Sequence, residues 1–188
     1  MVDDPAFPLW HGEIGLRPFH PDEGPAFVEA VLESVPEIAP WMPWARPDYG
    51  LTDADGWIQE TRGAFDACTK HEFAICDRAD RLLGGVGLNM RNDLHRFANL
   101  GYWVRTSAAG RGVATAAART AALFGFEGLD LQRIEILVIV GNVGSLRVAE
   151  KIGARREGVL RNRLRIYGES RDAVMHSLVP EDLGRPNR

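Results

Sequence analysis

The sequence predicts a mixed α/β domain of the α+β kind, in which helices are interspersed around a mostly antiparallel sheet. Three observations support this. Seven short runs are rich in aliphatic and β-branched residues, as strands are. Four other segments carry apolar residues at helical spacing or begin with a capping residue. A polar turn at 77–81 lies between two of the strands, which predicts a hairpin.

Local signals place the individual elements. Phe27 and Val31 repeat at helical spacing within the first helix, and Gly153 is a typical residue for the end of the last one. Pro40 and Pro43 exclude a regular helix between the first two helices. The expected strands are 14–18, 72–76, 82–88, 97–104, 133–140, 154–164 and 172–179, and the expected helices are 21–36, 52–70, 112–127 and 142–152.

With 188 residues, 45% of them hydrophobic and 26% charged, the chain is expected to form a single domain over 1–188. Residues 1–12 and 181–188 are expected as peripheral tails. Residues 1–10 lack the pattern of a signal peptide, and no segment reaches transmembrane length. The two cysteines, without a His/Cys cluster, favour neither a disulfide framework nor a zinc site. We expect a cytoplasmic monomer or homodimer without a metal or a membrane partner.

The charge distribution limits the possible partners. A formal net charge of −4 disfavours a protein that binds nucleic acid by neutralising phosphates. Residues 1–66 hold 13 acidic and 3 basic side chains, whereas residues 144–171 hold 3 acidic and 8 basic ones. Two interpretations stay open: an ordinary solvated surface, or an acidic face for a cationic acceptor opposite a basic face for an anionic ligand.

A glycine-bearing loop precedes the alanine-rich helix. Gly110-Arg111-Gly112 follows the strand at 97–104, and Val113-Ala114-Thr115 begins the helix. Backbone N–H groups at a helix start, together with the helix dipole, form a site suited to phosphate. The alternative is a turn that needs glycine for its geometry alone.

Two nucleotide-binding motifs fit this loop poorly. Asp130 lies near the spacing of a ribose-binding acid, but Thr115 stands where a dinucleotide motif needs its third glycine, and no βαβ series precedes the loop. The lysine of an NTPase phosphate loop is also missing.

A second polar group follows the apolar strand at 133–140. Asn142 has both a donor and an acceptor for an amide-bearing ligand, and Ser145 places a hydroxyl one turn later. The alternative is that Asn142 only caps the helix and that Ser145 supports the cap.

Taken together, these segments resemble the GCN5-related N-acetyltransferase (GNAT) superfamily, and within it the ribosomal-protein-acetyltransferase-like branch of the RimJ/RimL type. The resemblance covers most of the chain. It depends on the order and spacing of Leu16-Arg17-Pro18, Trp41-Met42-Pro43-Trp44, Gly84-Gly85-Val86-Gly87, Gly101-Tyr102-Trp103-Val104, the 110–115 loop, Asn142 with Ser145, Glu150-Lys151-Ile152-Gly153, Glu157-Gly158-Val159-Leu160-Arg161 and Asp172.

The resemblance implies the GNAT fold: a twisted, mostly antiparallel sheet of about seven strands, helices on both faces, and a splayed strand pair that binds acyl-CoA. It also implies that acetyl-CoA is the co-substrate, with its pyrophosphate at 110–115 and its pantetheine arm along the strand that ends at Trp103 and Val104. The implied cofactor-binding residues are Trp103, Val104, Arg105, Gly110, Arg111, Gly112, Val113, Ala114, Thr115, Asn142, Ser145 and Lys151.

The implied reaction is attack of a neutral amine on the thioester, in which Ser145 serves the departing sulfur. This chain departs from the family pattern at three positions, since Ala109, Asn99 and Leu164 stand where polar or acidic side chains are common. Asn99 cannot act as a base but can orient a water. Glu135 is the leading ionisable candidate for the base, ahead of Asp93 and His95, and the choice among these and a water stays open.

For the amine acceptor, either a protein N-terminus or a small cationic amine, we expect Trp41 and Trp44 to line a pocket, with Tyr167 as a lesser candidate. Core packing of the tryptophans is the alternative. Two other functions stay open: a non-catalytic acyl-CoA-binding or sensing module, and an acyltransferase that uses a larger donor such as succinyl-CoA, for which the arginines at 161, 163 and 165 would provide positive charge.

Overall fold

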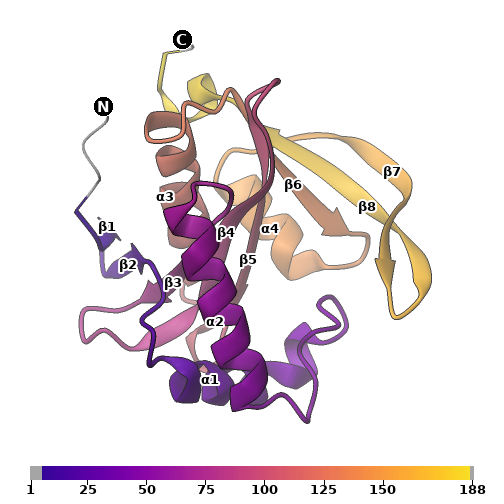
Figure 1. The fold of residues 1–188 in the computed structure, drawn as a ribbon. Helices are drawn as coiled ribbons and strands as arrows, with labels where there is room; N and C mark the ends of the chain where they lie inside the picture. The colour runs from indigo at the N-terminus through magenta and orange to yellow at the C-terminus, as the bar shows by residue number, and fades with distance from the viewer. Residues whose placement is uncertain (1–5, 187–188) are drawn as a thin grey trace.

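The computed structural model describes residues 6–186 and contains one eight-stranded sheet in the order β1-β2-β3-β4-β5-β6-β8-β7 (Figure 1). All neighbouring strands are antiparallel except β5 and β6. The strands are β1 (Leu9–His11), β2 (Ile14–Arg17), β3 (His71–Cys76), β4 (Leu82–Asn92), β5 (Phe97–Val104), β6 (Arg133–Ile139), β7 (Arg155–Ile166) and β8 (Glu169–Leu178). The helices are α1 (Gly24–Ile38), α2 (Leu51–Asp66), α3 (Val113–Glu127) and α4 (Val143–Lys151), with short 3₁₀ turns at Thr106–Ala108 and Pro180–Leu183.

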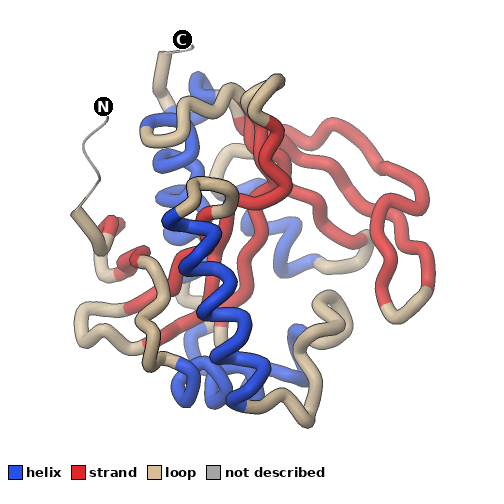
Figure 2. The backbone as a smooth tube through the Cα atoms, viewed as in Figure 1, coloured by secondary structure: helices blue, strands red, loops and turns tan. Residues whose placement is uncertain are grey.

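The two faces of the sheet are covered by different helix pairs. On one face α1 and α2 enclose a cluster that contains Phe19, Phe27 and Trp103, whereas α3 and α4 cover the larger cluster on the other face. Figure 2 shows these helices as separate blue segments against the red sheet. Strand β3 demonstrates the alternation, because Phe73 belongs to the larger cluster and its neighbour Ala74 to the smaller one. The mixed α/β fold with helices on both faces is thus confirmed.

The feature that matters most for function is the short pairing between β5 and β6. These parallel strands pair only at Phe97 with Arg133, Ala98 with Ile134 and Asn99 with Glu135. Beyond Asn99 they diverge, while β5 stays paired with β4 as far as Val104. The second half of β5 therefore presents a row of backbone groups toward the gap, as a sheet edge does.

Several expected boundaries are corrected by the structure. The sheet has eight strands rather than about seven, because Leu9–His11, which we placed in a tail, pairs with β2 as an edge strand. Leu183, placed in the other tail, is buried in the larger core cluster. Helix α1 continues through Pro36 to Ile38, since proline in the last turn removes a single backbone hydrogen bond. Helix α2 ends at Asp66, before Cys68 adopts a left-handed φ of 55°.

Helix α1 holds the segment that follows β5 by a set of polar contacts. The guanidinium of Arg105, 5% exposed, donates through Nε to Glu33 at 2.9 Å and through NH2 to Glu29 at 2.6 Å. The backbone N–H of Ser107 also donates to Glu33, at 2.6 Å. The hydrogen bond from Arg105 lowers the pKa of Glu33 to about 2. This contact fixes the start of the loop that leads to Gly110 and Gly112.

No helix within residues 6–186 is both long and apolar enough to cross a membrane.

Replacing Glu33 with Gln is expected to lower the free energy of unfolding by about 1.5–3 kcal/mol, the usual range for a charged hydrogen bond. Glu29→Gln is the matched control: Glu29 binds the same arginine but is 69% exposed, so its loss should cost less than about 1 kcal/mol. Urea unfolding measures both values. Equal losses in the two variants would contradict the role of Glu33.

The pH dependence of stability gives a second readout of the same contact. Because folding lowers the pKa of Glu33 from 4.5 to about 2, its contribution is full above pH 4.5 and is lost as the pH falls toward 2. The difference between the wild type and Glu33→Gln should therefore shrink across this interval. A difference that stays constant down to pH 2 would contradict this assignment.

Candidate active site

A groove of about 510 Å³ opens where β5 and β6 diverge. Its walls come from the end of β5, the glycine loop, the first turns of α3 and α4, and the segment after α1. It is lined by Ile38, Trp41, Met42, Tyr102, Trp103, Val104, Ala109, Gly110, Gly112, Val113, Ala114, Thr115, Asn142, Ser145 and Lys151, among others. Two polar segments that lie about 30 residues apart in the chain thus meet at one opening.

The glycine loop adopts a conformation that turns the start of α3 toward this groove. Gly112 is the N-cap residue of α3 and has a φ of 81°, a value that favours glycine. By the geometry of an α-helix, the first N–H groups, at 113–115, have no carbonyl one turn back to bind. Arg111 is exposed and lies outside the groove lining. The loop is thus built to bind an anion mainly through its backbone.

On the other side of the groove, Asn142 is the N-cap residue of α4. Its Oδ1 accepts a hydrogen bond from the Ser145 N–H at 3.1 Å, so Asn142 is a helix cap and also lines the groove. The hydroxyl of Tyr102 on β5 donates to the Ser145 carbonyl at 3.0 Å and lies 3.0 Å from Ser145 Oγ. Burial raises the pKa of Tyr102 to about 12, so this phenol stays protonated. A pair of hydroxyl groups therefore spans the groove.

A second cavity, of about 410 Å³, lies on the α1/α2 face of the sheet. Met42, Tyr102 and Trp103 line both cavities, so the two share a wall. The other residues that line the second cavity are Phe27, Trp44, Arg46, Tyr49, Asp53, Trp57, Glu72, Gly85, Asn89 and Gly101. It is thus a largely aromatic chamber that contains one buried carboxylate, beside a polar groove.

That carboxylate belongs to Glu72, which no sequence pattern singled out. Asn89 Nδ2 donates to Glu72 Oε1 at 3.1 Å, and Asn99 Nδ2 donates to Asn89 Oδ1 at 3.0 Å. Asn99 therefore does not line the cavity and reaches Glu72 only through Asn89. The available signal was an acidic residue at the start of the otherwise apolar strand expected at 72–76, next to positions where burial makes a charge costly.

Three expected site residues, Arg105, Glu135 and Tyr167, line neither cavity, and contacts with other residues hold their side chains. Glu135 lines neither cavity, and its Oε1 accepts from Arg133 Nε at 2.9 Å. The Arg105 side chain binds Glu33 and Glu29 of α1. Tyr167, 64% exposed, donates to the Ala39 carbonyl at 2.9 Å, which joins the tip of the β7–β8 hairpin to the loop near Trp41. The two tryptophans separate, since Trp41 lines the groove and Trp44 the aromatic cavity.

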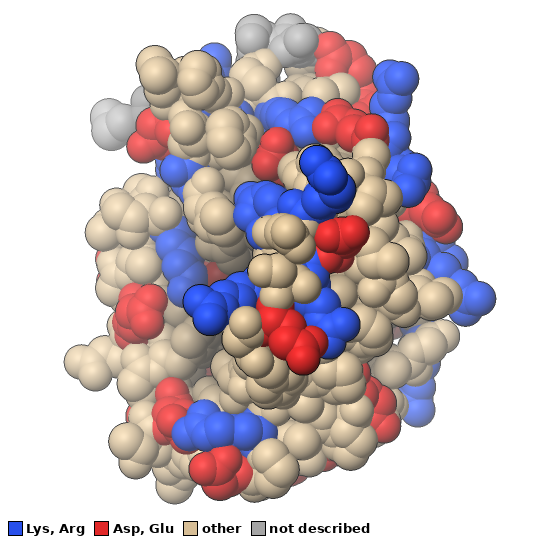
Figure 3. Space-filling view, turned by 90° about the vertical axis from the view of Figure 1, so that its right-hand side faces the viewer, with Lys and Arg blue, Asp and Glu red and all other residues tan. Residues whose placement is uncertain are grey.

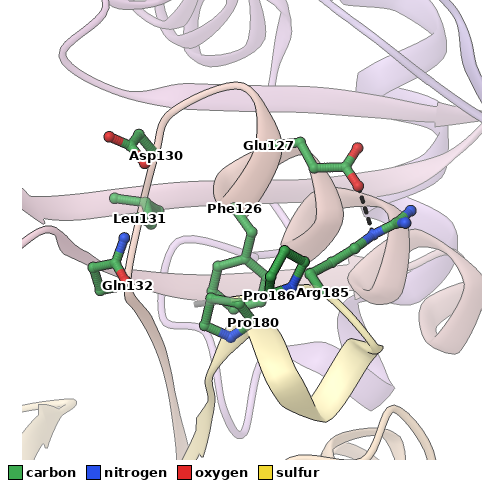
Figure 4. Close-up of a pocket in the computed structure, with 8 residues that line it drawn as sticks. All are labelled: Phe126, Glu127, Asp130, Leu131, Gln132, Pro180, Arg185 and Pro186. Carbon is green, nitrogen blue, oxygen red and sulfur yellow. Dashed lines mark ion pairs between the residues drawn. The ribbon is translucent and has the colours of Figure 1, made fainter. Parts of the chain in front are cut away.

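A further cavity of about 330 Å³ lies near the other end of α3 (Figure 4). Asp130, the residue near the spacing of a ribose-binding acid in a dinucleotide motif, lines this cavity. A helix of 15 residues, about 22 Å long, separates Asp130 from the glycine loop, so the two cannot hold one nucleotide phosphate and its ribose. None of the expected site residues lines this cavity.

The basic surplus of 144–171 does not form a uniform patch. Figure 3 views the side of the molecule that carries the hairpin and shows Lys and Arg interspersed with Asp and Glu. Within this segment Arg171 pairs with Glu169 at 2.8 Å, while Glu157 pairs with Arg133 of β6 at 2.6 Å, which lowers the pKa of Glu157 to about 2. Within residues 6–186 no group of three or more His, Cys, Asp or Glu side chains is arranged to hold a metal ion.

Comparison with known proteins decides the family. The model described as "Acetyltransferase (GNAT) domain" matches residues 13–155. The chain belongs to this GNAT family. It is therefore an acyltransferase by family, and its sheet with the divergent β5 and β6 is a GNAT fold.

Relatives of this GNAT domain place it in the RimJ/RimL-like branch. It is 27% identical over 176 residues to a Bacillus subtilis protein provisionally named ribosomal N-acetyltransferase YdaF, covering 90% of this chain and 92% of the relative. A Vibrio cholerae structure, provisionally described as a ribosomal-protein-serine acetyltransferase, is 29% identical with a TM-score of 0.82, covering 94% of this chain and 99% of that one. Mycobacterium smegmatis RimJ, solved with CoA-disulfide, is 26% identical with a TM-score of 0.85, covering 93% and 85%.

The cap that begins α4 can be tested alone. Asn142→Ala is expected to lower the free energy of unfolding by about 1 kcal/mol, because the Ser145 N–H loses its acceptor. Asn142→Asp keeps an acceptor at the same place and should stay near wild type. Urea unfolding measures both, and equal destabilisation by Ala and Asp would contradict the capping role.

Proposed function

We propose that this GNAT domain transfers the acetyl group of acetyl-CoA to a primary amine. The observation that carries the proposal is the groove between β5 and β6, where the unpaired N–H groups of α3, the free edge of β5 and the Ser145 hydroxyl meet. Its volume of about 510 Å³ is ordinary for a cofactor site. The complex of the related RimJ with CoA-disulfide supports a CoA ligand.

Each part of the groove suits one part of this co-substrate. The N-terminus of α3 offers backbone donors and a positive dipole end to the pyrophosphate. The free edge of β5 offers amide and carbonyl groups to the pantetheine arm, as a sheet edge does to an added strand. Tyr102 and Ser145 lie where the groove meets the aromatic cavity, a suitable place to protonate a departing thiolate.

The acceptor enters from the aromatic cavity. The names of the relatives favour a ribosomal protein as acceptor, while the aromatic walls of the cavity also suit a small amine. The arginines at 161, 163 and 165 were expected to provide positive charge for a succinyl donor. They lie on β7 and line neither cavity. Acetyl-CoA is therefore the donor that we favour.

Gly112→Pro is expected to abolish the binding of acetyl-CoA, because proline cannot adopt the left-handed φ that begins α3. Arg111→Ala should weaken binding only modestly, since that side chain lies outside the groove lining. Isothermal titration measures both affinities, and circular dichroism checks that each variant is folded. Equal affinities in both variants and the wild type would overturn the assignment of the loop.

Transfer itself is tested by the release of CoA thiol in the presence of amines and N-terminal peptides. We expect turnover with acetyl-CoA, and we expect Ser145→Ala to lower kcat on the order of a hundredfold with little change in the affinity for acetyl-CoA. Ser107→Ala, an exposed serine outside the groove lining, is the control.

A protein that binds acetyl-CoA yet acylates none of these acceptors at any pH would instead be a sensing module. Faster turnover with succinyl-CoA than with acetyl-CoA would contradict the choice of donor.

A further inference from the structure

The Glu72 carboxylate of β3 reaches the aromatic cavity across the neighbouring strand β4. Glu72 on β3 pairs with Gly87 on β4, and Gly87 pairs with Gly101 on β5. A Cβ atom at Gly87 would overlap the Glu72 carboxylate, so the glycine is what allows that side chain to lie across β4 toward β5. The carboxylate of a distant strand thereby reaches the cavity.

The contacts of this carboxylate use only one of its oxygens. Oε1 accepts from Asn89 at 3.1 Å and lies 3.9 Å from Lys70 Nζ. Among residues 6–186, no donor forms a hydrogen bond with Oε2 or pairs with it. The Glu72 side chain is 13% exposed and lines the cavity, and Oε2 is not among the fully buried unpartnered atoms, so it stays open to a donor that enters the cavity. A positively charged group inside the cavity would supply one.

We propose that Glu72 binds the ammonium group of the acceptor and removes its proton before attack on the thioester. This assignment rests on the proposed function of the groove. It makes Glu72 the base that Asn99 cannot be, and that Glu135, held by Arg133, is not placed to be. Asn89 and Asn99 act as positioning residues, because they orient the carboxylate through successive hydrogen bonds.

Two protons leave the attacking nitrogen during the proposed transfer, one to Glu72 and one to the departing sulfur. One ammonium proton passes to Oε2 of Glu72, which becomes a neutral carboxyl and later releases the proton to solvent. The amine lone pair forms the N–C bond, and the carbonyl π electrons move to oxygen. When the tetrahedral intermediate collapses, the oxyanion re-forms the C=O bond, the C–S bond breaks, and the thiolate leaves with the bonding pair. The second proton of the attacking nitrogen reaches that sulfur through the hydroxyl groups of Ser145 and Tyr102.

The walls of the cavity define the acceptor class. Trp44, Tyr49, Trp57 and Trp103 surround a space of about 410 Å³, which suits a primary ammonium on a compact, flat or apolar body. Aromatic faces also stabilise the cation before it loses its proton. A small arylalkylamine and an N-terminal residue with an apolar side chain share this chemistry.

The electrostatic surroundings are consistent with a base. Burial raises the pKa of Glu72, which brings it nearer to working pH, while Asn89 and Lys70 oppose the shift and Glu60 adds to it. The other charged groups that line the cavity are Arg46 and Asp53, whose 2.8 Å ion pair leaves neither unpaired. Lys70 lies outside the lining.

The first test needs no turnover. Binding of benzylamine, charged at neutral pH, is followed by tryptophan fluorescence and compared with its neutral analogue benzyl alcohol and with a short peptide that begins with phenylalanine. Glu72→Gln should weaken benzylamine binding at least about tenfold and leave benzyl alcohol unchanged. Glu60→Gln is the matched control, because it removes a carboxylate 3.6 Å from the same Lys70 but outside the cavity lining.

Equal affinity of wild type and Glu72→Gln for benzylamine would overturn the proposal, whether or not the protein turns over acetyl-CoA. Tighter binding of the peptide than of benzylamine would identify an N-terminus as the source of the ammonium group. Tighter binding of benzylamine would identify a small amine. In either case the proposal requires that Glu72→Gln lose affinity for the preferred ligand.

The second test separates a base from a binding group. Glu72→Gln should lower kcat on the order of a hundredfold and remove the acidic limb of the kcat/KM pH profile, while acetyl-CoA affinity stays at the wild-type value. Glu72→Asp should restore part of the rate with a shifted limb. An unchanged profile in Glu72→Gln would overturn the proposal. Absence of any turnover in the wild type, with benzylamine binding that depends on Glu72, would instead reject the proposed transfer reaction.

Discussion

The divergence of β5 and β6 is the constraint on which the rest of the site depends. Parallel strands that pair at three positions and then separate leave backbone groups of β5 without a neighbour. The same separation lets the N-termini of α3 and α4 open onto one groove. Glycine at 112 and the cap at Asn142 then fix the first turns of the two helices. A ligand with phosphate at one end and amide groups along its length would bind the N-terminal N–H groups of α3 with the phosphate and the free backbone groups of β5 with the amides.

The two cavities meet at Tyr102, Trp103 and Met42, so β5 borders both of them and, under the proposed function, would hold both substrates. Alternation along β5 accounts for this. Trp103 packs into the α1/α2 cluster, while its neighbour Tyr102 reaches Ser145 across the groove. Holding two reactants on one rigid strand is an efficient way to reduce the entropy cost of their encounter. Rigidity at the end of this strand comes from Arg105, which α1 binds through Glu33.

Local signals in the sequence predicted most of the helices and strands. The GNAT resemblance, rather than those signals, implied that the glycine loop would meet Asn142 and Ser145, and the three line one groove. Glu72 was missed because its approach over Gly87 depends on the register of β3 and β4, which single-sequence patterns do not reveal. Arg105 and Glu135 were expected in the site, but Glu33 of α1 holds the Arg105 side chain and Arg133 of the same strand holds Glu135. Single-sequence patterns do not reveal such pairings either. The edge strand Leu9–His11 is too short to give a periodic signal.

The central claim is that acetyl-CoA lies between β5 and β6 with its phosphates on α3. Hydrogen exchange with and without acetyl-CoA tests this most directly, because it reports on the backbone N–H groups themselves. Added protection confined to the amides of 100–104, 110–115 and 142–145 is the expected result. Protection centred on the 126–132 cavity, or no change at 110–115 under saturating acetyl-CoA, would contradict the claim.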